Sequence, residues 1–218
     1  DLAEHGLGLS PLDHKRLQDN CSHIIHCGAY VHHIFPYSQL KAANSDSTLE
    51  LIKIAMRGHP KKLSFISTAS AVTECNNEEI GYEGKVGVHP APFFGGYAMS
   101  KWVSERLMEQ AFARGMSGMI LRPGNIFANS ATGISSPITS NFALLMKRAY
   151  LDSGLAPDLD LIFEAVPVNQ LAEAIVACTL SDCEHSILNL SNPLEIPLPD
   201  YVALLNKITN KTIQIIPF

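Results

Sequence analysis

Two apolar segments, separated by one helix-length segment, constrain the fold of this chain more than any other feature. Residues 62–68 and 119–125 are short and largely apolar, as the buried strands of a parallel sheet are. Residues 97–114 predict a helix, which Gly95–Gly96 precedes and Gly115 follows as a C-cap. This strand–helix–strand order predicts a right-handed parallel crossover. Both strand ends and the start of the helix then lie at one edge of the sheet, where α/β proteins bind ligands.

Helices and strands are expected to alternate through the rest of the chain. The expected helices are residues 11–18, 44–57, 138–150, 169–179 and 201–208, and the expected strands are residues 22–27, 186–190 and 212–216. Residues 71–95 are polar and Gly-rich, and a loop of that length is more often functional than idle. The alternation predicts an α/β fold built on a parallel sheet.

Three side chains that suit acid–base chemistry are expected at this edge. Thr68 ends the first strand, and Tyr97 and Lys101 share one helix face because they are four residues apart. A phenol titrates near ~10 in water, and a fixed ammonium beside it lowers that pKa, so the pair can act as one acid. Two alternatives stay open. Lys101 could be a solvated helix lysine, and Ser67 or Ser70 could supply the hydroxyl in place of Thr68.

Five motifs are spread along the chain, namely IIHCGAYVH at residues 24–32, PYSQLK at 36–41, GGYAMSKW at 95–102, LRPG at 121–124 and VPV at 166–168. Together they resemble the thioester reductase domain, a member of the extended short-chain dehydrogenase/reductase superfamily. This domain ends nonribosomal peptide and polyketide synthases and also occurs in carboxylic acid reductases and aminoadipate reductase. The resemblance covers nearly the whole chain, and the GGY…SKW motif is its most specific part. It implies that Thr68, Tyr97 and Lys101 form the catalytic Ser/Thr–Tyr–Lys triad of the superfamily.

The resemblance also implies NADPH as the cofactor and a set of residues that bind it. These residues are Cys27, Gly28 and Ala29 on the adenosine side, Asn44, Tyr97 and Lys101 near the reacting centre, and Pro123, Gly124, Asn125 and Ile126 along the nicotinamide. Two of these positions have a structural alternative. Gly28 suits any tight turn, and Asn44 suits a helix N-cap.

The implied reaction is the reductive release of an acyl or peptidyl thioester from the phosphopantetheine arm of a carrier protein. Hydride addition generates an oxyanion that Tyr97 and Thr68 would meet as donors, with Lys101 holding the nicotinamide ribose. Loss of the thiol leaves an aldehyde, and a second hydride would give an alcohol. The alternatives are another extended reductase, such as a nucleotide-sugar epimerase or dehydratase or a fatty acyl-CoA reductase, and an inactive truncated scaffold or docking module.

The first residues of the chain match the family only after its third strand. The resemblance therefore places the family's glycine-rich turn, which cradles the cofactor pyrophosphate at a helix N-terminus, before Asp1. Gly6 and Gly8 follow no strand and are expected to be loop residues. We expect an incomplete Rossmann-like parallel sheet whose first βαβ units are absent, and a chain that is inactive alone.

The expected organisation is a single integrated domain with two parts. Residues 1–127 and about 162–192 would form the nucleotide-binding, Rossmann-like portion. By resemblance, residues of about 128–161 and 193–218 would form a small, mostly helical C-terminal substrate-binding subdomain.

Charge and residue usage exclude several other classes of function. A net charge of −5 without a Lys/Arg cluster argues against nucleic-acid binding. Neither an apolar run of membrane-spanning length nor a signal-peptide pattern occurs, and five cysteines without CxxC spacing indicate reduced thiols, so we expect a cytoplasmic protein. His23 and His26 lie an odd number of residues apart on a strand and should point to opposite faces. No metal site is expected.

Overall fold

The computed structural model describes residues 1–72, 83, 95–135, 142–182 and 187–217. The chain divides into two compact units. The first unit contains Asp1–Pro123 and Glu173–Leu190, and the second contains Gly124–Ala172 and Ser191–Phe218. Most of the predicted loop at 71–95 lies outside the described residues.

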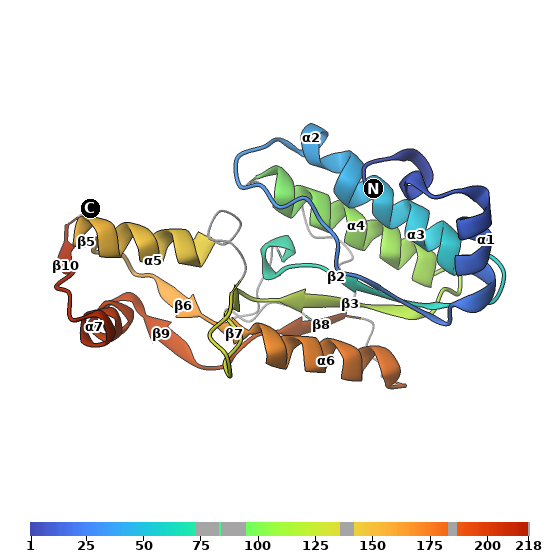
Figure 1. Ribbon diagram of the computed structural model, residues 1–218. Coiled ribbons are helices and arrows are strands. Elements are labelled where there is room, and N and C mark those ends of the chain that lie inside the picture. Colours follow the sequence, from blue (N-terminus) through green and yellow to red (C-terminus); the bar gives the residue numbers. More distant parts are fainter. Residues whose placement is uncertain (73–82, 84–94, 136–141, 183–186, 218) are drawn as a thin grey trace. The chain divides into compact units, whose positions relative to one another are not determined.

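The first unit is built on a four-stranded parallel sheet (Figure 1). Its strands are β1 (His23–His26), β2 (Lys62–Ile66), β3 (Gly118–Pro123) and β8 (Ile187–Leu190), in the order β1-β2-β3-β8. The register pairs Ser64 of β2 with Ile25 on one side and with Met119 on the other. The predicted α/β fold with a parallel sheet is confirmed, and all four strands of this sheet were expected within one or two residues at each end.

Helices cover both faces of this sheet. The helices α1 (Pro11–Asn20), α3 (Ser47–Ala55) and α4 (Gly96–Phe112) lie on one face, and α6 (Val168–Leu180) lies on the other. The short helical turns of this unit are η1 (His5–Gly8), α2 (Tyr37–Lys41), η2 (Ala42–Asp46) and η3 (Ala69–Ala71). Leu63 and Phe65 of β2 pack with Met108 of α4 in the buried core. Ser64 lies between Leu63 and Phe65 on β2, so its side chain points to the other face of the sheet. There it accepts a hydrogen bond from Thr179 Oγ1 of α6 at 2.9 Å.

The helix expected at residues 44–57 begins earlier than predicted. The chain is already helical from Tyr37, passes through the π-helical turn η2 and continues as α3. Apolar periodicity does not reveal this start, because the buried face carries polar side chains such as Asn44 and Thr48 beside Leu40. These polar side chains have hydrogen-bond partners in the interior: Asn44 Nδ2 donates to Ser100 Oγ, and Thr48 Oγ1 donates to the Asn44 carbonyl oxygen at 2.7 Å.

In its described residues, the second unit is assembled from short strand pairs and helices. Its strands are β4 (Ile126–Phe127), β5 (Leu155–Pro157), β6 (Ile162–Glu164), β7 (Val166–Pro167), β9 (Glu195–Pro197) and β10 (Gln214–Ile216), and its helices are α5 (Phe142–Ser153) and α7 (Leu198–Thr209). β4 pairs with β7 and β5 with β10 in parallel, whereas β6 and β9 are antiparallel. Phe163 stacks on Tyr201 at 4.1 Å between ring centroids in its core. The start of the helix expected at 138–150 lies outside the described residues.

Candidate active site

Two glycines place the start of α4 against the chain that leads into α2. Gly95 has a φ of +67°, a conformation that glycine adopts without strain. A Cβ on Gly96 would clash with the backbone of residues 35–37. The pair therefore lets α4 begin in close contact with this segment and fixes the position of Tyr97 in its first turn.

Lys101 is buried, with 3% of its surface exposed. Its Nζ donates a hydrogen bond to the Ile66 carbonyl oxygen at 2.7 Å and lies 6.0 Å from the centroid of the Tyr97 ring. Burial lowers the pKa of Lys101 to about 8, and the neighbouring Cys27 and Glu105 partly oppose this shift. The alternative of a solvated helix lysine is therefore wrong.

The Tyr97 phenol differs from the sequence-based expectation. Burial raises its pKa to about 12, although the Lys101 ammonium was expected to lower it. The ammonium is directed at the Ile66 carbonyl oxygen, so the desolvation of a phenolate outweighs its attraction. Tyr97 is consequently a protonated hydrogen-bond donor at neutral pH.

Asn44 ties three segments together beneath this pair. Its Oδ1 accepts from the Tyr30 N–H at 2.7 Å, and its Nδ2 donates to the Tyr30 carbonyl oxygen at 3.1 Å and to Ser100 Oγ at 2.8 Å. Ser100 Oγ donates in turn to the Tyr97 carbonyl oxygen at 2.7 Å. Asn44 lies inside the π-helical turn η2, so its interpretation as an N-cap is wrong; such turns often occur at functional sites.

The hydroxyls that follow β2 have different environments. Ser67 is buried and donates to Glu105 Oε1 at 2.5 Å, so its proton is already engaged. Thr68 is half-buried, and its Oγ1 accepts from the Ser70 N–H at 3.3 Å. Its Oγ1 also lies 3.3 Å from Ser70 Oγ, a hydrogen bond in which either hydroxyl can donate. Thr68 is therefore more accessible than Ser67, whose proton is engaged by Glu105.

The turn after β1 approaches the same lysine. Cys27 is exposed and close enough to Lys101 for their charges to interact, while partial burial raises the pKa of its thiol. A Cβ on Gly28 would meet the end of the Leu2 side chain, which would have to shift to make room. The cofactor role of Cys27, Gly28 and Ala29 stays a prediction.

The predicted nicotinamide-lining residues fall in both units. Pro123 ends β3 in the first unit. In the second unit, a Cβ on Gly124 would clash with the Glu164 carboxylate, and the Asn125 carbonyl oxygen accepts from the Val166 N–H at 2.9 Å. Ile126 is 40% exposed in β4. Their cofactor role stays a prediction.

Glu105 and Arg122 form a buried ion pair that sequence reasoning missed. Arg122 Nε donates to Glu105 Oε1 at 2.9 Å, and Arg122 Nη2 donates to Glu105 Oε2 at 2.7 Å. Glu105 is 0% exposed and Arg122 2%. The available signal was spacing, since Glu105 follows Lys101 by four residues and Arg122 interrupts an apolar strand.

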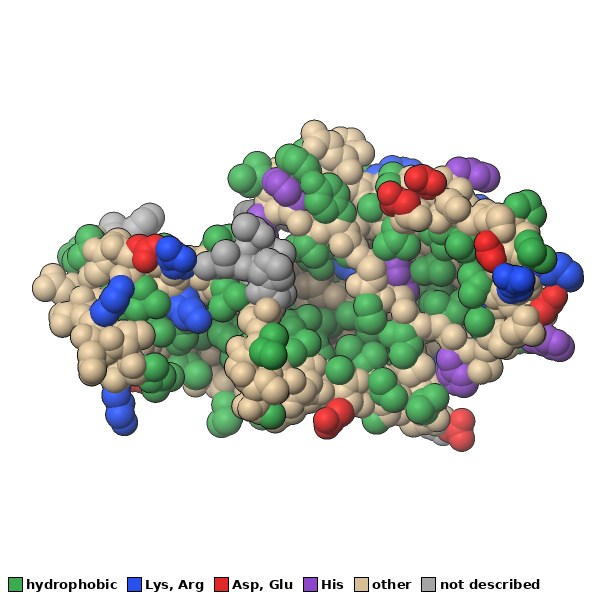
Figure 2. Space-filling view, viewed as in Figure 1, with side chains coloured by type: hydrophobic (Ala, Val, Ile, Leu, Met, Phe, Trp, Pro, Cys, Tyr) green, Lys and Arg blue, Asp and Glu red, His purple; other side chains and the backbone are tan. Residues whose placement is uncertain are grey.

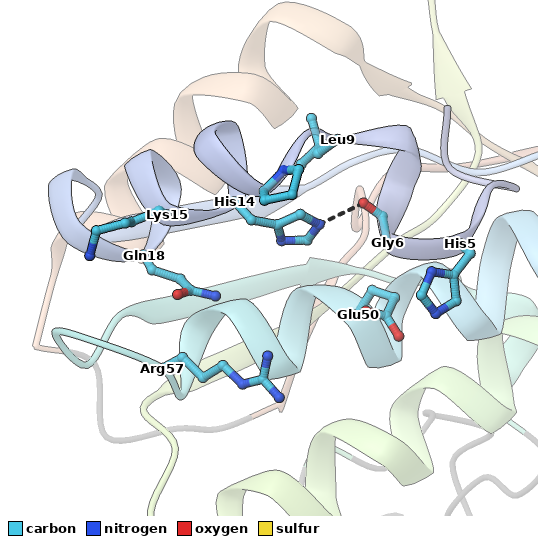
Figure 3. Close-up of a pocket in the computed structure, with 9 residues that line it drawn as sticks. His5, Gly6, Leu9, His14, Lys15, Gln18, Glu50 and Arg57 are labelled. Atoms are coloured by element: carbon cyan, nitrogen blue, oxygen red, sulfur yellow. Dashed lines mark hydrogen bonds between the residues drawn. The ribbon is translucent and has the colours of Figure 1, made fainter.

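A separate cavity of about 510 Å³ lies among η1, α1 and α3 (Figure 3). His5, His14 and Arg57 line it, and His14 Nε2 lies 2.8 Å from the Gly6 carbonyl oxygen. The predicted site residues are not among those that line it.

Other expectations concern metals, membranes and nucleic acids. His23 is exposed and His26 is buried, which confirms that they point to opposite faces. Within the described residues, we find neither a group of three potential metal ligands nor a helix long and apolar enough to cross a membrane. On the face of the first unit seen in Figure 2, the described Lys and Arg side chains are interspersed with Asp and Glu.

A buried lysine lies one turn after a tyrosine on a helix that starts at the carboxyl edge of a parallel sheet, as the resemblance to the short-chain dehydrogenase/reductase superfamily predicts. The chain belongs to the family of NAD-binding domains described as male sterility protein (NAD_binding_4), whose model matches residues 1–175.

The relatives and structural neighbours of the chain include reductase domains. It is 31% identical to L-2-aminoadipate reductase of Saccharomyces cerevisiae over 94% of the chain and to a linear gramicidin synthase protein of Brevibacillus parabrevis over 99%. The terminal R domain of the myxalamid PKS-NRPS pathway superposes with a TM-score of 0.84 at 28% identity and over 100% of the chain. The chain spans 16% and 4% of the two relatives and 55% of the R domain.

Proposed function

We propose that this chain belongs to an NADPH-dependent reductase that releases a carrier-bound acyl or peptidyl thioester as an aldehyde. The observation that carries the proposal is the buried Lys101 ammonium, held by the Ile66 carbonyl oxygen at 2.7 Å and 6.0 Å from the Tyr97 ring centroid. Burying an ammonium that has a single hydrogen-bond acceptor among the described residues is costly for folding, so a functional reason for its burial is favoured. Relatives that are reductases support the redox chemistry.

The donor set around Lys101 fits a nicotinamide ribose. An ammonium has three N–H donors, and the Ile66 carbonyl oxygen engages one of them. The others are suited to ribose hydroxyls. Cys27, Gly28 and Ala29 would contact the adenosine side, and Pro123 would contact the nicotinamide side.

The side chains have distinct roles in the proposed reaction. NADPH, when bound, supplies the hydride that turns the thioester carbonyl into an oxyanion. Tyr97, whose pKa of about 12 keeps its proton on the phenol at neutral pH, donates that proton to the oxyanion. Thr68 donates a second hydrogen bond to the same oxygen, and Lys101 stabilises the tyrosinate that remains. The resulting hemithioacetal expels the thiol of the carrier arm and leaves the aldehyde.

The proposed partner is a phosphopantetheinyl carrier protein or domain. A peptide synthase is among the relatives of this chain, and a thioester on a flexible arm suits a site at the edge of a sheet. We also propose a cytoplasmic location, in line with reduced cysteines.

The test uses the natural protein that carries this chain. An acyl thioester on a phosphopantetheinylated carrier is offered with NADPH, and NADPH oxidation and trapped aldehyde are measured together. The proposal predicts one aldehyde per NADPH in the first reduction. A UDP-sugar offered with NAD⁺ is the comparison substrate, and turnover of that sugar without aldehyde formation from the thioester would favour an epimerase-type reductase instead.

A further inference from the structure

We propose that Glu105 and Arg122 are positioning residues for this reaction, which hold the ends of β2 and β3 against α4 so that Lys101 and Thr68 keep their places. The inference rests on the proposed function. It adds a buried ion pair to the residues on which the rate depends.

The ion pair joins three elements of the first unit. Glu105 projects from α4, Arg122 is in β3, and Ser67 directly follows β2. Glu105 Oε1 accepts from both Ser67 Oγ, at 2.5 Å, and Arg122 Nε, at 2.9 Å, while Oε2 accepts from Arg122 Nη2. Both carboxylate oxygens thus accept hydrogen bonds, which fix the orientation of the carboxylate.

The same three elements carry the proposed catalytic groups. Ser67 lies between Ile66, whose carbonyl oxygen holds the Lys101 ammonium, and Thr68. Glu105 lies one turn after Lys101 on the same helix face. A displacement of the Glu105 carboxylate would therefore shift Lys101, which lies on the same helix, and Thr68, which is next to Ser67.

Stability alone does not explain why such a pair is present. A buried ion pair can often be replaced by apolar side chains of similar volume with no loss of stability, whereas removing one partner strands a buried charge. The pair at Glu105 and Arg122 is almost fully buried. A role in holding the site is the reason we infer for it.

The charge of Glu105 also acts on Lys101. The groups that face the ammonium are Cys27 after β1, Glu105 and Tyr97 on α4, and His26 of β1, which burial and Lys101 keep neutral by lowering its pKa to about 4. Glu105 raises the pKa of Lys101 against the effect of burial. Without this carboxylate, Lys101 loses its proton at lower pH, and the alkaline limit of activity moves in the same direction.

Two variants and one control test the inference in the natural protein. Glu105→Leu with Arg122→Met removes the pair without stranding a charge. Glu105→Gln removes the negative charge and leaves the Arg122 guanidinium without its carboxylate, so this variant should unfold at a lower temperature than wild type. The control is Glu109→Gln, one turn further along α4, whose carboxylate pairs with Arg106 at 3.0 Å on its own helix. Readouts are kcat for thioester reduction, its pH profile, the thermal unfolding midpoint, and the Lys101 pKa from NMR of labelled lysine.

We expect the double variant to unfold somewhat below the wild-type temperature, because Ser67 Oγ loses its acceptor, and to lose about tenfold to a hundredfold in kcat, as small misplacements of reacting groups do. Glu105→Gln should lower the Lys101 pKa and also the pH at which kcat falls on the alkaline side. Glu109→Gln should change neither. A double variant with wild-type kcat would overturn the inference. If wild type reduces no thioester, the proposed function fails. The inference about Glu105 is then tested by the NMR titration, and a Lys101 pKa that Glu105→Gln leaves unchanged would overturn it. The same titration is the test if the double variant does not fold.

Discussion

Replacing Lys101 with methionine should make the protein more stable while it disables the site. Methionine retains much of the side-chain length and carries no charge. Burial lowers the Lys101 pKa from 10.5 to about 8, and one pKa unit corresponds to about 1.4 kcal/mol. Keeping the proton on the buried lysine at neutral pH therefore costs about 3 kcal/mol. The substitution removes this cost.

Part of the gain is lost because the Ile66 carbonyl oxygen loses the hydrogen bond that it accepts at 2.7 Å. An unsatisfied buried acceptor costs about 1–3 kcal/mol. The net expectation is that Lys101→Met raises the free energy of unfolding by up to about 2 kcal/mol at pH 7.

The pH dependence separates this explanation from simple packing. The unfolded chain keeps the lysine proton up to the ordinary pKa of 10.5, whereas the folded protein releases it from about pH 8 upward. Wild type therefore gains stability as pH rises between these values, and the advantage of the variant shrinks. Urea unfolding followed by circular dichroism at pH 7 and at about pH 10 measures both differences.

Lys53→Met is the matched control, because Lys53 is a half-exposed helix lysine paired with Glu50 at 2.6 Å. It should change stability by at most about 0.5 kcal/mol at either pH. The reasoning is refuted if Lys101→Met is less stable than wild type at pH 7, or if its stability difference is the same at both pH values.

Three further predictions concern the natural protein and the chain. Lys101→Met should lower kcat and weaken NADPH binding together, and an unchanged Kd from calorimetric titration would remove Lys101 from the cofactor site. Asn44→Ala should lower the free energy of unfolding, measured in urea, by about 2–4 kcal/mol, because it leaves the backbone N–H and carbonyl of Tyr30 without their partner. A decrease of less than about 1 kcal/mol would contradict the importance of these hydrogen bonds. The 218 residues alone should bind NADPH weakly, since the residues that the resemblance assigns to the cofactor contact its adenosine and nicotinamide and do not cradle its pyrophosphate; micromolar affinity in the same titration would show that other residues bind the phosphates.

The parallel sheet and the Tyr97–Lys101 helix could be predicted because local signals specify them. Buried parallel strands are continuous apolar runs, and the helix has glycines at both ends. The spacing of Lys101 from Tyr97 predicted that the two side chains share one helix face. It did not predict the burial of Lys101 or the direction of the Tyr97 pKa shift, because both depend on how the rest of the unit packs around these side chains.

Other features depend on contacts between distant residues, which no local pattern reports. The π-helical turn at Asn44 is held by bonds to Tyr30 and Ser100, 14 and 56 residues away. The strands β4 and β7 are two residues long and too short to show a period. The bonds of Glu105 reach 17 and 38 residues along the chain, so only its position one turn after Lys101 could have indicated it.

The central claim, that Tyr97 is the acid of a thioester reductase, is tested most directly by Tyr97→Phe in the natural protein. Aldehyde formed from a carrier-bound thioester is measured in a single turnover, with Tyr37→Phe as the control that loses a phenol on α2. The account predicts a loss of about 10²-fold or more for Tyr97→Phe, nearly unchanged NADPH affinity and folding, and wild-type rates for the control. Aldehyde formation by Tyr97→Phe at more than about a tenth of the wild-type rate would contradict the claim.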